Sequence, residues 1–519
     1  MTIASRYTTS SRTRQQLVRR DAVIVIAATL SVFIYVVVAQ RVAGGPGFPL
    51  DDAWIHQTYG RNLALSGQWQ FMPGIESAGS TSPLYSLLLA FGYSLHIPYF
   101  FWTHLLGALA LTLTALVSAH MADRLFPAAR HAGLWTGFAI AGAWHLAWAA
   151  SSGMETVLFS ALCLVLISGA WATMEPEIDI RAQFPRGAAF GILAALLIAT
   201  RLEGIILVAL LAILILVARP QPLRILGLWF AGALVGGLLG IAPYVLLNLH
   251  LNGTLVPNTF SAKQAENVEL LAQPFLTNLA AMLTPLTAGG EIFLLPGAVW
   301  AARQIIRREF FRGGLLYLAL AIWPALLILL YALRLPAYYQ HGRYVIPALP
   351  PVLVLGVGGT LNALQWARHN RRIWARVLIP GLSLTALAVF IIFWVNGAYI
   401  LGRDVKDINS DMLVASTWIK ENVPPDQLLA VHDIGAVGYF APRPILDLAG
   451  LVSPEVVPII RNPAALMTLM QQRNVRYLMV LPSQRPAPAD DPRLCERFNA
   501  NGGMGGMTIY ELAWDGHCP

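Results

Sequence analysis

Residues 48–87 read FPLDDAWIHQTYGRNLALSGQWQFMPGIESAGSTSPLYSL and directly follow the first long apolar segment of the chain. Two carboxylates, Asp51 and Asp52, stand side by side before a helical run from Ala53 to Leu65, which Gly67 closes. An aspartate at a helix start accepts hydrogen bonds from the free backbone amides there and suits the helix dipole. That role accounts for one of the two carboxylates, and it accounts less well for a pair at the edge of a membrane.

The helical run has one apolar face. Ile55, Tyr59 and Leu63 recur every four residues, which places them on the same side of a helix. The polar residues point elsewhere: His56, Arg61 and Asn62. The spacing therefore predicts an amphipathic helix that lies along a membrane surface.

The composition excludes an ordinary soluble protein. Of the 519 residues, 56% are hydrophobic and 12% are charged, and the mean hydropathy is +0.60. Apolar runs of about 20 residues, the length that crosses a bilayer as a helix, recur along the chain. They predict eleven membrane spans, near residues 22–40, 100–122, 131–150, 155–173, 187–200, 204–218, 225–247, 280–301, 314–334, 345–365 and 375–396. The run 83–95 is too short to cross, so we expect a second interfacial or re-entrant helix there.

Basic residues are distributed unevenly between the two sides of these spans. The first span follows a basic tail and has no obvious cleavage site after it, which predicts a retained anchor with the N-terminus in the cytoplasm. With this threading, 19 of the 35 Lys and Arg residues lie on the cytoplasmic side and 6 on the other, and the remaining 10 follow residue 402. The asymmetry explains the net charge of +8 without a nucleic-acid partner.

The polar clusters that suggest chemistry all fall on the outer side. They are the Asp pair and the segments 151–155, 200–204, 248–278 and 338–344. A channel or carrier would instead scatter ionisable groups through the middle of its helices, and we expect none there. An enzyme is therefore favoured, and a non-catalytic transporter or flippase of a lipid-linked sugar is the alternative.

The composition changes at Gly402. Charge returns, and a predicted helix at 411–421 is followed by the alternating apolar runs LLAVHDI and VRYLMVL. Together they indicate a small α/β domain outside the membrane. Cys495 and Cys518 both lie in it, so we expect a disulfide between them in an oxidising compartment, with two free thiols as the alternative. The predicted organisation is a cytoplasmic tail (1–21), a membrane domain (22–401) with a first external loop (41–99), and an extracytoplasmic domain (402–519).

An activated substrate outside the cytoplasm must arrive attached to a lipid, because no nucleotide is available there. A sugar on a polyprenyl phosphate meets that need, and its transfer requires a general base and cations for the leaving phosphate. Asp51 or Asp52 can supply the base. Adjacent carboxylates can raise the pKa of one another, or together hold a divalent cation, and both readings stay open. The candidate cations are Lys263, Arg343, His341 and Arg201.

Other residues are candidates with a structural alternative. Tyr339 and Tyr344 interleave with the basic residues of 338–344, which predicts a phosphate and sugar pocket or an aromatic belt at the interface. Glu203, two residues after Arg201, can help to bind the sugar donor, or it can merely pair with other helix-end groups and anchor the spans at the interface. The candidates for acceptor contact or support are His56, Glu155, Asn258, His432 and Asp433.

Six motifs in order resemble a known superfamily. DDAWIHQTYGRNLA, GSTSPLYSLLLA, GMETVLF, TRLEG, NGTLVPNTFSAK and HGRYVIPALP are similar to segments of the GT-C membrane glycosyltransferases. More narrowly they resemble the bacterial family that includes the terminal β-arabinofuranosyltransferases of the mycobacterial cell envelope. The C-terminal HDIGAVGYFAPRPILDLAGLVSPEV is similar to the outer domain of that broader family.

The resemblance implies a fold, a reaction and a location. The fold is a polytopic α-helical GT-C bundle with interfacial helices in its first external loop and a small C-terminal α/β domain. The reaction moves a sugar, with a pentofuranose such as arabinose as one candidate, from polyprenyl phosphate to an envelope glycan or glycolipid, with inversion by single displacement. Asp51 would be the base, and Asp52 would orient the acceptor or a metal. The implied location is the bacterial cytoplasmic membrane.

Overall fold

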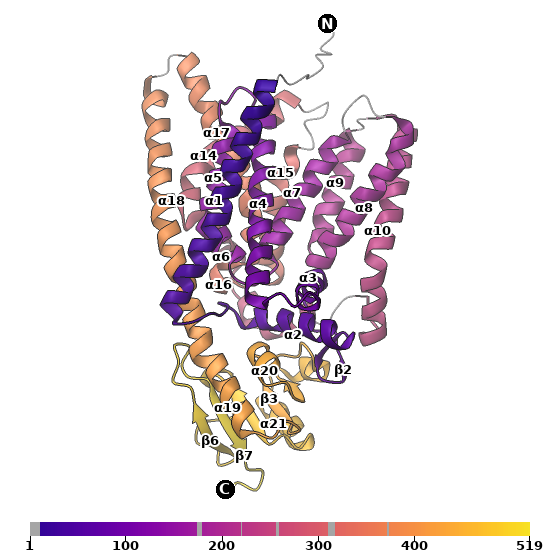
Figure 1. Ribbon diagram of the computed structural model, residues 1–519, viewed down its shortest axis with the longest axis vertical. Helices are drawn as coiled ribbons and strands as arrows, with labels where there is room; N and C mark the ends of the chain where they lie inside the picture. The colour runs from indigo at the N-terminus through magenta and orange to yellow at the C-terminus, as the bar shows by residue number, and fades with distance from the viewer. Residues whose placement is uncertain are drawn as a thin grey trace.

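The computed structural model describes residues 11–173, 179–218, 221–255, 259–309, 317–370 and 373–518. Long helices stand side by side as a bundle, with the start of the first helix at one end and a small C-terminal domain at the other (Figure 1). The helices of this bundle are α1 (Ser11–Ala43), α4 (Tyr99–Leu125), α5 (Ala132–Gly142), α6 (Trp144–Ala150), α7 (Thr156–Ala172), α8 (Gln183–Thr200), α9 (Gly204–Ala218), α10 (Leu223–Asn252), α13 (Phe275–Thr287), α14 (Leu295–Glu309), α15 (Ala319–Arg334), α17 (Leu349–His369) and α18 (Ile373–Ile408).

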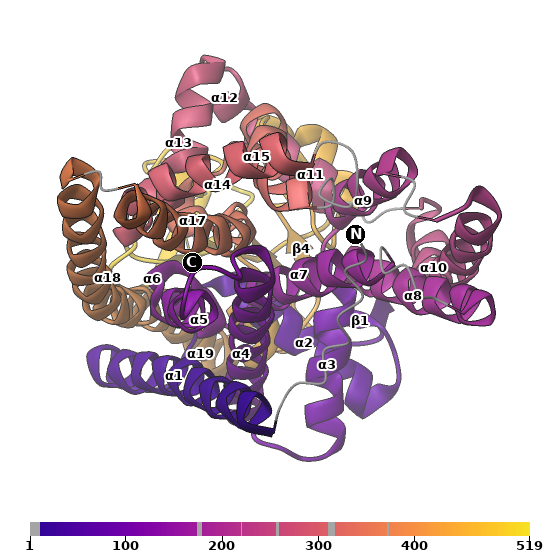
Figure 2. The ribbon, with the colours of Figure 1, turned by 90° about the horizontal axis from the view of Figure 1, so that it is seen from above.

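Six helices in the described ranges are long and apolar enough to cross a membrane, or seven if the bent pair α13 and α14 is one span. Four more apolar helices, α5, α7, α9 and α15, have 10–17 residues. Viewed down the bundle (Figure 2), α1 and α18 pack together along one edge, and α8 and α10 pack together at the opposite edge. The chain therefore builds a polytopic helical protein.

The predicted number of eleven spans stays a prediction, although a helix or helix pair lies at each predicted segment. Two of the segments are not single helices. Segment 131–150 is interrupted at Ala143, between α5 and α6. Segment 280–301 bends by 89° between α13 and α14.

A buried carboxylate contradicts the expectation that mid-span positions lack ionisable groups. Glu291 follows this bend, in a 3-10 helix from Gly290 to Leu294. It is 1% exposed, and neither carboxylate oxygen has a hydrogen-bond partner. The absence of mid-span charge therefore no longer argues against a carrier.

The first external loop forms a layer between the bundle and the C-terminal domain. Helix α2 (Asp51–Ser66) lies across the end of the bundle, and α3 (Pro83–Ser94) lies beside it (Figure 1). A short hairpin of β1 (Gln70–Met72) and β2 (Ile75–Glu76) joins them. Gly60 lets the two helices approach, because a Cβ there would lie 2.9 Å from Leu89 Cβ. Both expected interfacial helices are thus present.

The amphipathic interpretation of α2 is wrong for its first half. All residues from Ala53 to Gly60 are buried, and His56 and Gln57 are 1% and 0% exposed. The reason is that the C-terminal domain covers the face opposite the bundle, so residues 53–60 are enclosed on both sides. Polar side chains on it must therefore find partners inside the protein.

Short helices lie at the same end of the bundle, and the first and last of them carry further candidate residues. They are α11 (Thr259–Glu266), α12 (Val268–Leu271) and α16 (Tyr339–Gly342).

The C-terminal domain is an α/β domain with one five-stranded sheet. The strand order is β4-β3-β5-β7-β6, with parallel pairs on either side of β3 and antiparallel pairs on either side of β7. The alternating runs LLAVHDI and VRYLMVL contain β3 and β5. Its elements are α19 (Val414–Asn422), β3 (Leu429–Val431), α20 (Gly435–Phe440), β4 (Ile445–Asp447), α21 (Pro463–Gln472), β5 (Tyr477–Val480), β6 (Leu494–Asn499) and β7 (Thr508–Leu512).

One continuous helical path connects the bundle to this domain. Helix α18 passes through residue 402 and continues through a π-helical turn, Asn409–Leu413, into α19. The helix predicted at 411–421 is therefore the end of a longer one. The Asp411 carboxylate accepts hydrogen bonds from the backbone amides of Met504 and Met507, which fastens the β6–β7 loop to the π-helical turn.

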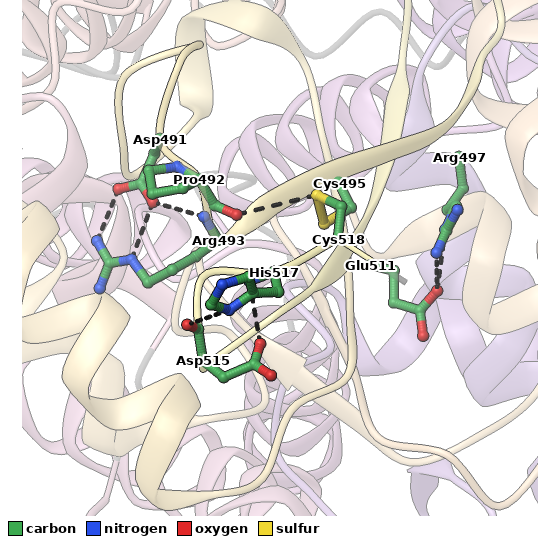
Figure 3. The surroundings of a disulfide bond; sticks show 9 residues. All are labelled: Asp491, Pro492, Arg493, Cys495, Arg497, Glu511, Asp515, His517 and Cys518. Carbon is green, nitrogen blue, oxygen red and sulfur yellow. Dashed lines mark hydrogen bonds and ion pairs between the residues drawn. A yellow bond between two sulfur atoms is a disulfide. The ribbon is translucent and has the colours of Figure 1, made fainter.

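A disulfide joins Cys495 and Cys518, as the sequence predicted (Figure 3). It ties the C-terminal end of the chain to the edge strand β6, next to the Asp491–Arg493 ion pair. The third cysteine, Cys163, is buried in α7 as a free thiol.

Removal of this disulfide should destabilise the C-terminal domain. The bridge closes a loop of 23 residues, and loops of this size contribute on the order of 3 kcal/mol by restricting the unfolded chain. We expect the pair of changes Cys495→Ser and Cys518→Ser to lower the melting temperature of the domain, measured by differential scanning fluorimetry. The change Cys163→Ala is the control for loss of a cysteine outside this domain. An unchanged melting temperature in the double variant would contradict the expectation.

Candidate functional site

The carboxylate of Asp52 meets two cations from distant parts of the chain. Lys263 Nζ, on α11, lies 3.4 Å from Asp52 Oδ2, and Arg343 Nη2 donates a hydrogen bond to the same oxygen. The hydroxyl of Tyr344 accepts from both cations, at 3.0 Å from Lys263 Nζ and 3.1 Å from Arg343 Nη2. Three segments far apart in sequence therefore converge on one anion.

The charges in this cluster stabilise one another. Burial by itself would raise the pKa of Asp52, but Lys263 and Arg343 hold it well below its usual range. Burial would likewise lower the pKa of Lys263, and Asp52 raises it instead. Asp52 is thus an anion at neutral pH, and 28% of its side chain is exposed.

Asp51 has a different partner, in the C-terminal domain. Its two oxygens accept from the backbone amides of Gly435, at 2.6 Å, and Ala436, at 2.7 Å. These are the first amides of α20, so Asp51 caps a helix 384 residues away and not its own. Helix α2 has no side-chain cap, which makes the capping interpretation wrong for α2 itself.

The environment of Asp51 shifts its ionisation in the opposite direction from that of Asp52. Burial, and next the negative charge of Asp433, raise the pKa of Asp51 to about 7, although the two backbone amides oppose this. Two neighbouring carboxylates therefore differ in protonation at neutral pH. A pair of this kind separates the roles of anion and proton acceptor.

A second polar cluster lies on the side of α2 that faces the bundle. Arg201 Nε lies 2.8 Å from Glu203 Oε1 and 3.8 Å from Glu155 Oε1. Arg201 Nη2 donates to the Tyr331 hydroxyl at 3.2 Å, and that hydroxyl donates to Glu203. The guanidinium also lies over the ring of Tyr344, 5.2 Å from its centroid, so the two clusters share that ring.

His56 extends this cluster through α2. Its Nε2 lies 3.6 Å from Glu155 Oε2, and its Nδ1 lies 3.1 Å from Ser86 Oγ on α3. Burial lowers the pKa of His56, which favours the neutral imidazole. His56 and Glu155 thus connect α2, α3 and α7 below the Asp pair, in supporting positions.

His341 lies in a third cluster, apart from the cations with which it was predicted to act. Its Nε2 lies 2.8 Å from Asp404 Oδ2, on α18, and its ring packs against Trp144 and Trp148 of α6. The prediction that His341 contacts the donor phosphate together with Lys263 is not supported by these contacts. The physical reason is that the imidazole is hydrogen-bonded to the Asp404 carboxylate, which a distant helix, α18, brings to it.

The C-terminal domain brings His432 and Asp433 to the same end. His432 Nε2 lies 3.5 Å from Glu266 Oε1 on α11, and Asp433 Oδ2 accepts from Gln484. Burial would lower the pKa of His432, but Asp433 and Glu266 raise it to about 9. This protonated imidazole lies between the C-terminal domain and the helix that carries Lys263.

Two further residues predicted from the sequence are Tyr339 and Asn258. Tyr339 lies close enough to Lys263 to interact with it electrostatically, and it is 36% exposed. Asn258 lies outside the residues that the structure describes.

The donor set does not fit a divalent cation shared by Asp51 and Asp52. The carboxylate of Asp52 faces Lys263 and Arg343, which repel a metal ion, and both oxygens of Asp51 accept backbone hydrogens. Among the described residues, no group of three or more His, Cys, Asp or Glu side chains is arranged as a metal site.

Several partners of the predicted residues carried too weak a signal in the sequence. Tyr331 and Asp404 lie near the ends of apolar helices, where such residues usually meet water or headgroups. Glu266 and Gly435 belong to segments whose spatial neighbours the sequence does not reveal. Glu266 follows Lys263 of the motif TFSAK by three residues, about one helical turn, and this spacing is the signal that could have identified it.

The contact between Asp51 and α20 depends on a glycine. A Cβ at Gly435 would lie 2.0 Å from the backbone oxygen of Asp51. We expect Gly435→Ala to weaken the docking of the C-terminal domain, seen as faster limited proteolysis and a lower melting temperature. Gly45→Ala is the matched control, because a Cβ there meets nothing within 4 Å. Equal behaviour of the two variants would contradict the role of this contact.

Comparison with known proteins identifies a similar domain and a similar fold. Residues 404–513 match a family described as "Domain of unknown function (DUF8728)". No match was found among curated proteins.

Solved structures match over nearly the whole chain. ArnT from Cupriavidus metallidurans, bound to undecaprenyl phosphate, is 16% identical with a TM-score of 0.63, over 96% of this chain and 99% of that one. The oligosaccharyltransferase AglB from Archaeoglobus fulgidus, in complex with an inhibitory peptide and a dolichol-phosphate, is 13% identical with a TM-score of 0.60, over 98% and 75%. The arabinofuranosyltransferase AftD from Mycobacteria is 15% identical with a TM-score of 0.52, over 94% and 40%. The protein therefore has the fold of the GT-C membrane glycosyltransferases.

Proposed function

We propose that the protein is a membrane glycosyltransferase that moves a sugar from a polyprenyl-phosphate donor to an acceptor on the outer face of the membrane. The observation that carries the proposal is the convergence of Lys263 and Arg343 on one anion, with the Tyr344 hydroxyl bound to both cations, beside a second carboxylate with a raised pKa. Two of the similar structures hold polyprenyl phosphates, which supports this choice of donor.

The cations suit a phosphate at the end of a lipid. Both already bind an anionic oxygen and a hydroxyl, so a phosphate can replace the Asp52 carboxylate as their partner without a new arrangement. Hydrogen bonds between charged groups are about twice as strong as neutral ones, and a guanidinium can engage two phosphate oxygens at once. Lys263 and Arg343 would stabilise the charge that the phosphate gains as it leaves.

Asp51 is the base in this proposal. A catalytic base works best when its pKa lies near the working pH, and the pKa of Asp51 is raised to about 7, whereas that of Asp52 is lowered. The acceptor oxygen forms a bond to the anomeric carbon while the bond from that carbon to the phosphate oxygen breaks. The acceptor proton passes to Asp51, the electron pair leaves with the phosphate, and the configuration inverts. No step requires a metal.

The C-terminal domain supplies the acceptor side. His432 and Asp433 lie over α11 near the Asp pair, where they can contact hydroxyl groups of an envelope glycan or glycolipid. A pentofuranose such as arabinose is the proposed sugar, supported by the similarity to AftD.

The proposed location is the bacterial cytoplasmic membrane, with the site and the C-terminal domain on the outer side. The support is the excess of Lys and Arg, 19 against 6, in the connections assigned to the cytoplasm.

Transfer by the purified protein tests the reaction and the base together. With a panel of polyprenyl-phosphate sugars, we expect the wild type to consume one donor. Asp51→Asn should lower kcat by about 10²-fold or more, the range of a general base, while donor binding persists. Asp52→Asn should lower KM, because the donor phosphate no longer competes with the Asp52 carboxylate for the two cations. Full activity of Asp51→Asn would contradict the base assignment. Absence of transfer with movement of lipid-linked sugar across a liposome bilayer would favour the flippase.

The pH dependence tests the environment of Asp51. A base must be ionised, so activity is lost as the pH falls through its pKa, and the logarithm of kcat/KM should rise below pH 7 and level off above it. Since the charge of Asp433 is the second cause of the raised pKa, Asp433→Asn should move the bend to lower pH. The exposed Asp426→Asn is the matched control. A bend that stays in place in Asp433→Asn would exclude this coupling.

A further inference from the structure

Three successive residues directly before Arg343 have a left-handed backbone. Gln340, His341 and Gly342 have φ angles of 55°, 57° and 67°. Residues with a side chain are uncommon in this region, because their Cβ crowds the neighbouring backbone. Such a segment persists only when its surroundings hold it in place. The next two residues belong to the proposed phosphate site: Arg343 donates to Asp52, and the Tyr344 hydroxyl accepts from Lys263.

The side chain of His341 is held by a carboxylate on another helix. Asp404 Oδ2, on α18, accepts from His341 Nε2 at 2.8 Å and from Trp148 Nε1 at 2.8 Å. A carboxylate can only accept, so the imidazole carries its hydrogen on Nε2. Trp148 is 1% exposed, so moving its side chain would leave a cavity in the core. Asp404 thus joins the left-handed segment to two helices at once.

Neighbouring side chains pack against the segment on two sides. The His341 ring lies edge-on against Trp144 and Trp148, with centroids 5.5 Å and 4.9 Å away. On the other side, a Cβ at Gly342 would lie 2.6 Å from Pro285 Cγ, so only glycine fits. Gln340 contributes through its backbone, because its Oε1 has no hydrogen-bond partner.

We propose that Asp404, His341 and Trp148 form a positioning clamp, which holds residues 340–342 in the left-handed conformation and thereby aims Arg343 and Tyr344 at the donor phosphate. The clamp contacts neither the phosphate nor the sugar. This inference rests on the proposed function, since it assigns to the clamp the geometry of the same phosphate site. It also gives His341 a role different from the direct phosphate contact that the sequence suggested.

The clamp links the phosphate site to the C-terminal domain. Asp404 is five residues before the π-helical turn that leads into α19, on the same continuous helix. Movement of that domain relative to the bundle would pull on Asp404, while Asp51 on the other side of the site is held by α20. The phosphate-binding residues and Asp51 therefore both depend on how the C-terminal domain packs against the bundle.

Binding of undecaprenyl phosphate to the full-length protein in nanodiscs, measured by microscale thermophoresis, tests the clamp with paired variants. Glycine tolerates a positive φ and a β-branched residue does not. Gln340→Val should therefore weaken binding about tenfold or more, the effect of roughly 1.4 kcal/mol, and Gln340→Gly should bind within about threefold of the wild type. Asp404→Leu removes the acceptor and should weaken binding similarly, whereas Asp404→Asn keeps one acceptor oxygen and should restore it.

A matched control separates backbone strain from general damage. His131 also has a positive φ, of 65°, but lies exposed at the start of α5. His131→Val should bind undecaprenyl phosphate as the wild type does. Lys263→Ala, which removes a proposed phosphate ligand, is the positive control for lost binding.

The outcomes distinguish the clamp from the proposed function. If Lys263→Ala weakens binding but Asp404→Leu and Gln340→Val do not, the clamp is overturned and the phosphate site stands. If wild type and Lys263→Ala bind equally, the phosphate site falls and the role of the clamp falls with it. If Gln340→Val does not fold, the Asp404 pair decides by itself, because equal binding of Asp404→Leu and Asp404→Asn would overturn the clamp.

Discussion

Two adjacent carboxylates at the start of a buried helix must find partners, and the places where they find them determine how this protein is assembled. Asp51 accepts the first amides of α20, which seats the C-terminal domain on the first external loop. Asp52 accepts from Lys263 and Arg343, which brings α11 and the segment before α17 to the same point. An unpaired buried carboxylate is strongly unfavourable, so these contacts constrain four separate parts of the chain.

The same constraint prepares the site for chemistry. One carboxylate lies among cations and stays ionised, and its neighbour lies among backbone amides and a further carboxylate, with a pKa near 7. The cations have an anionic partner that a phosphate can replace. The proton acceptor stands beside them under the C-terminal domain. In this arrangement the counter-ion, the base and the domain contact all derive from two successive residues.

Much of the site could be predicted from residue type and position in external loops. Lys263, Arg343 and Tyr344 were predicted as donor ligands because polar residues between apolar spans fall on one side of a membrane, and the structure brings these three together. His341 lies in the same loop and was predicted as a donor ligand for the same reason. Its imidazole instead contacts Asp404, which lies near the end of an apolar helix and was not predicted as a partner. The face pattern of α2 was misleading for a related reason. It assumes one face in water, and a domain from the far end of the chain covers that face.

The sequence by itself determined the apolar spans, the polar loops at one end of them, the pair of carboxylates and the separate C-terminal domain, because these follow from local composition and spacing. Only the tertiary structure decided which carboxylate meets which partner. Asp51 and Asp52 are identical in chemistry and adjacent in the chain, so no local property distinguishes them. Their difference arises from neighbours about 200 to 400 residues away, on α11, in the segment before α17 and on α20, whose positions depend on the packing of the whole bundle.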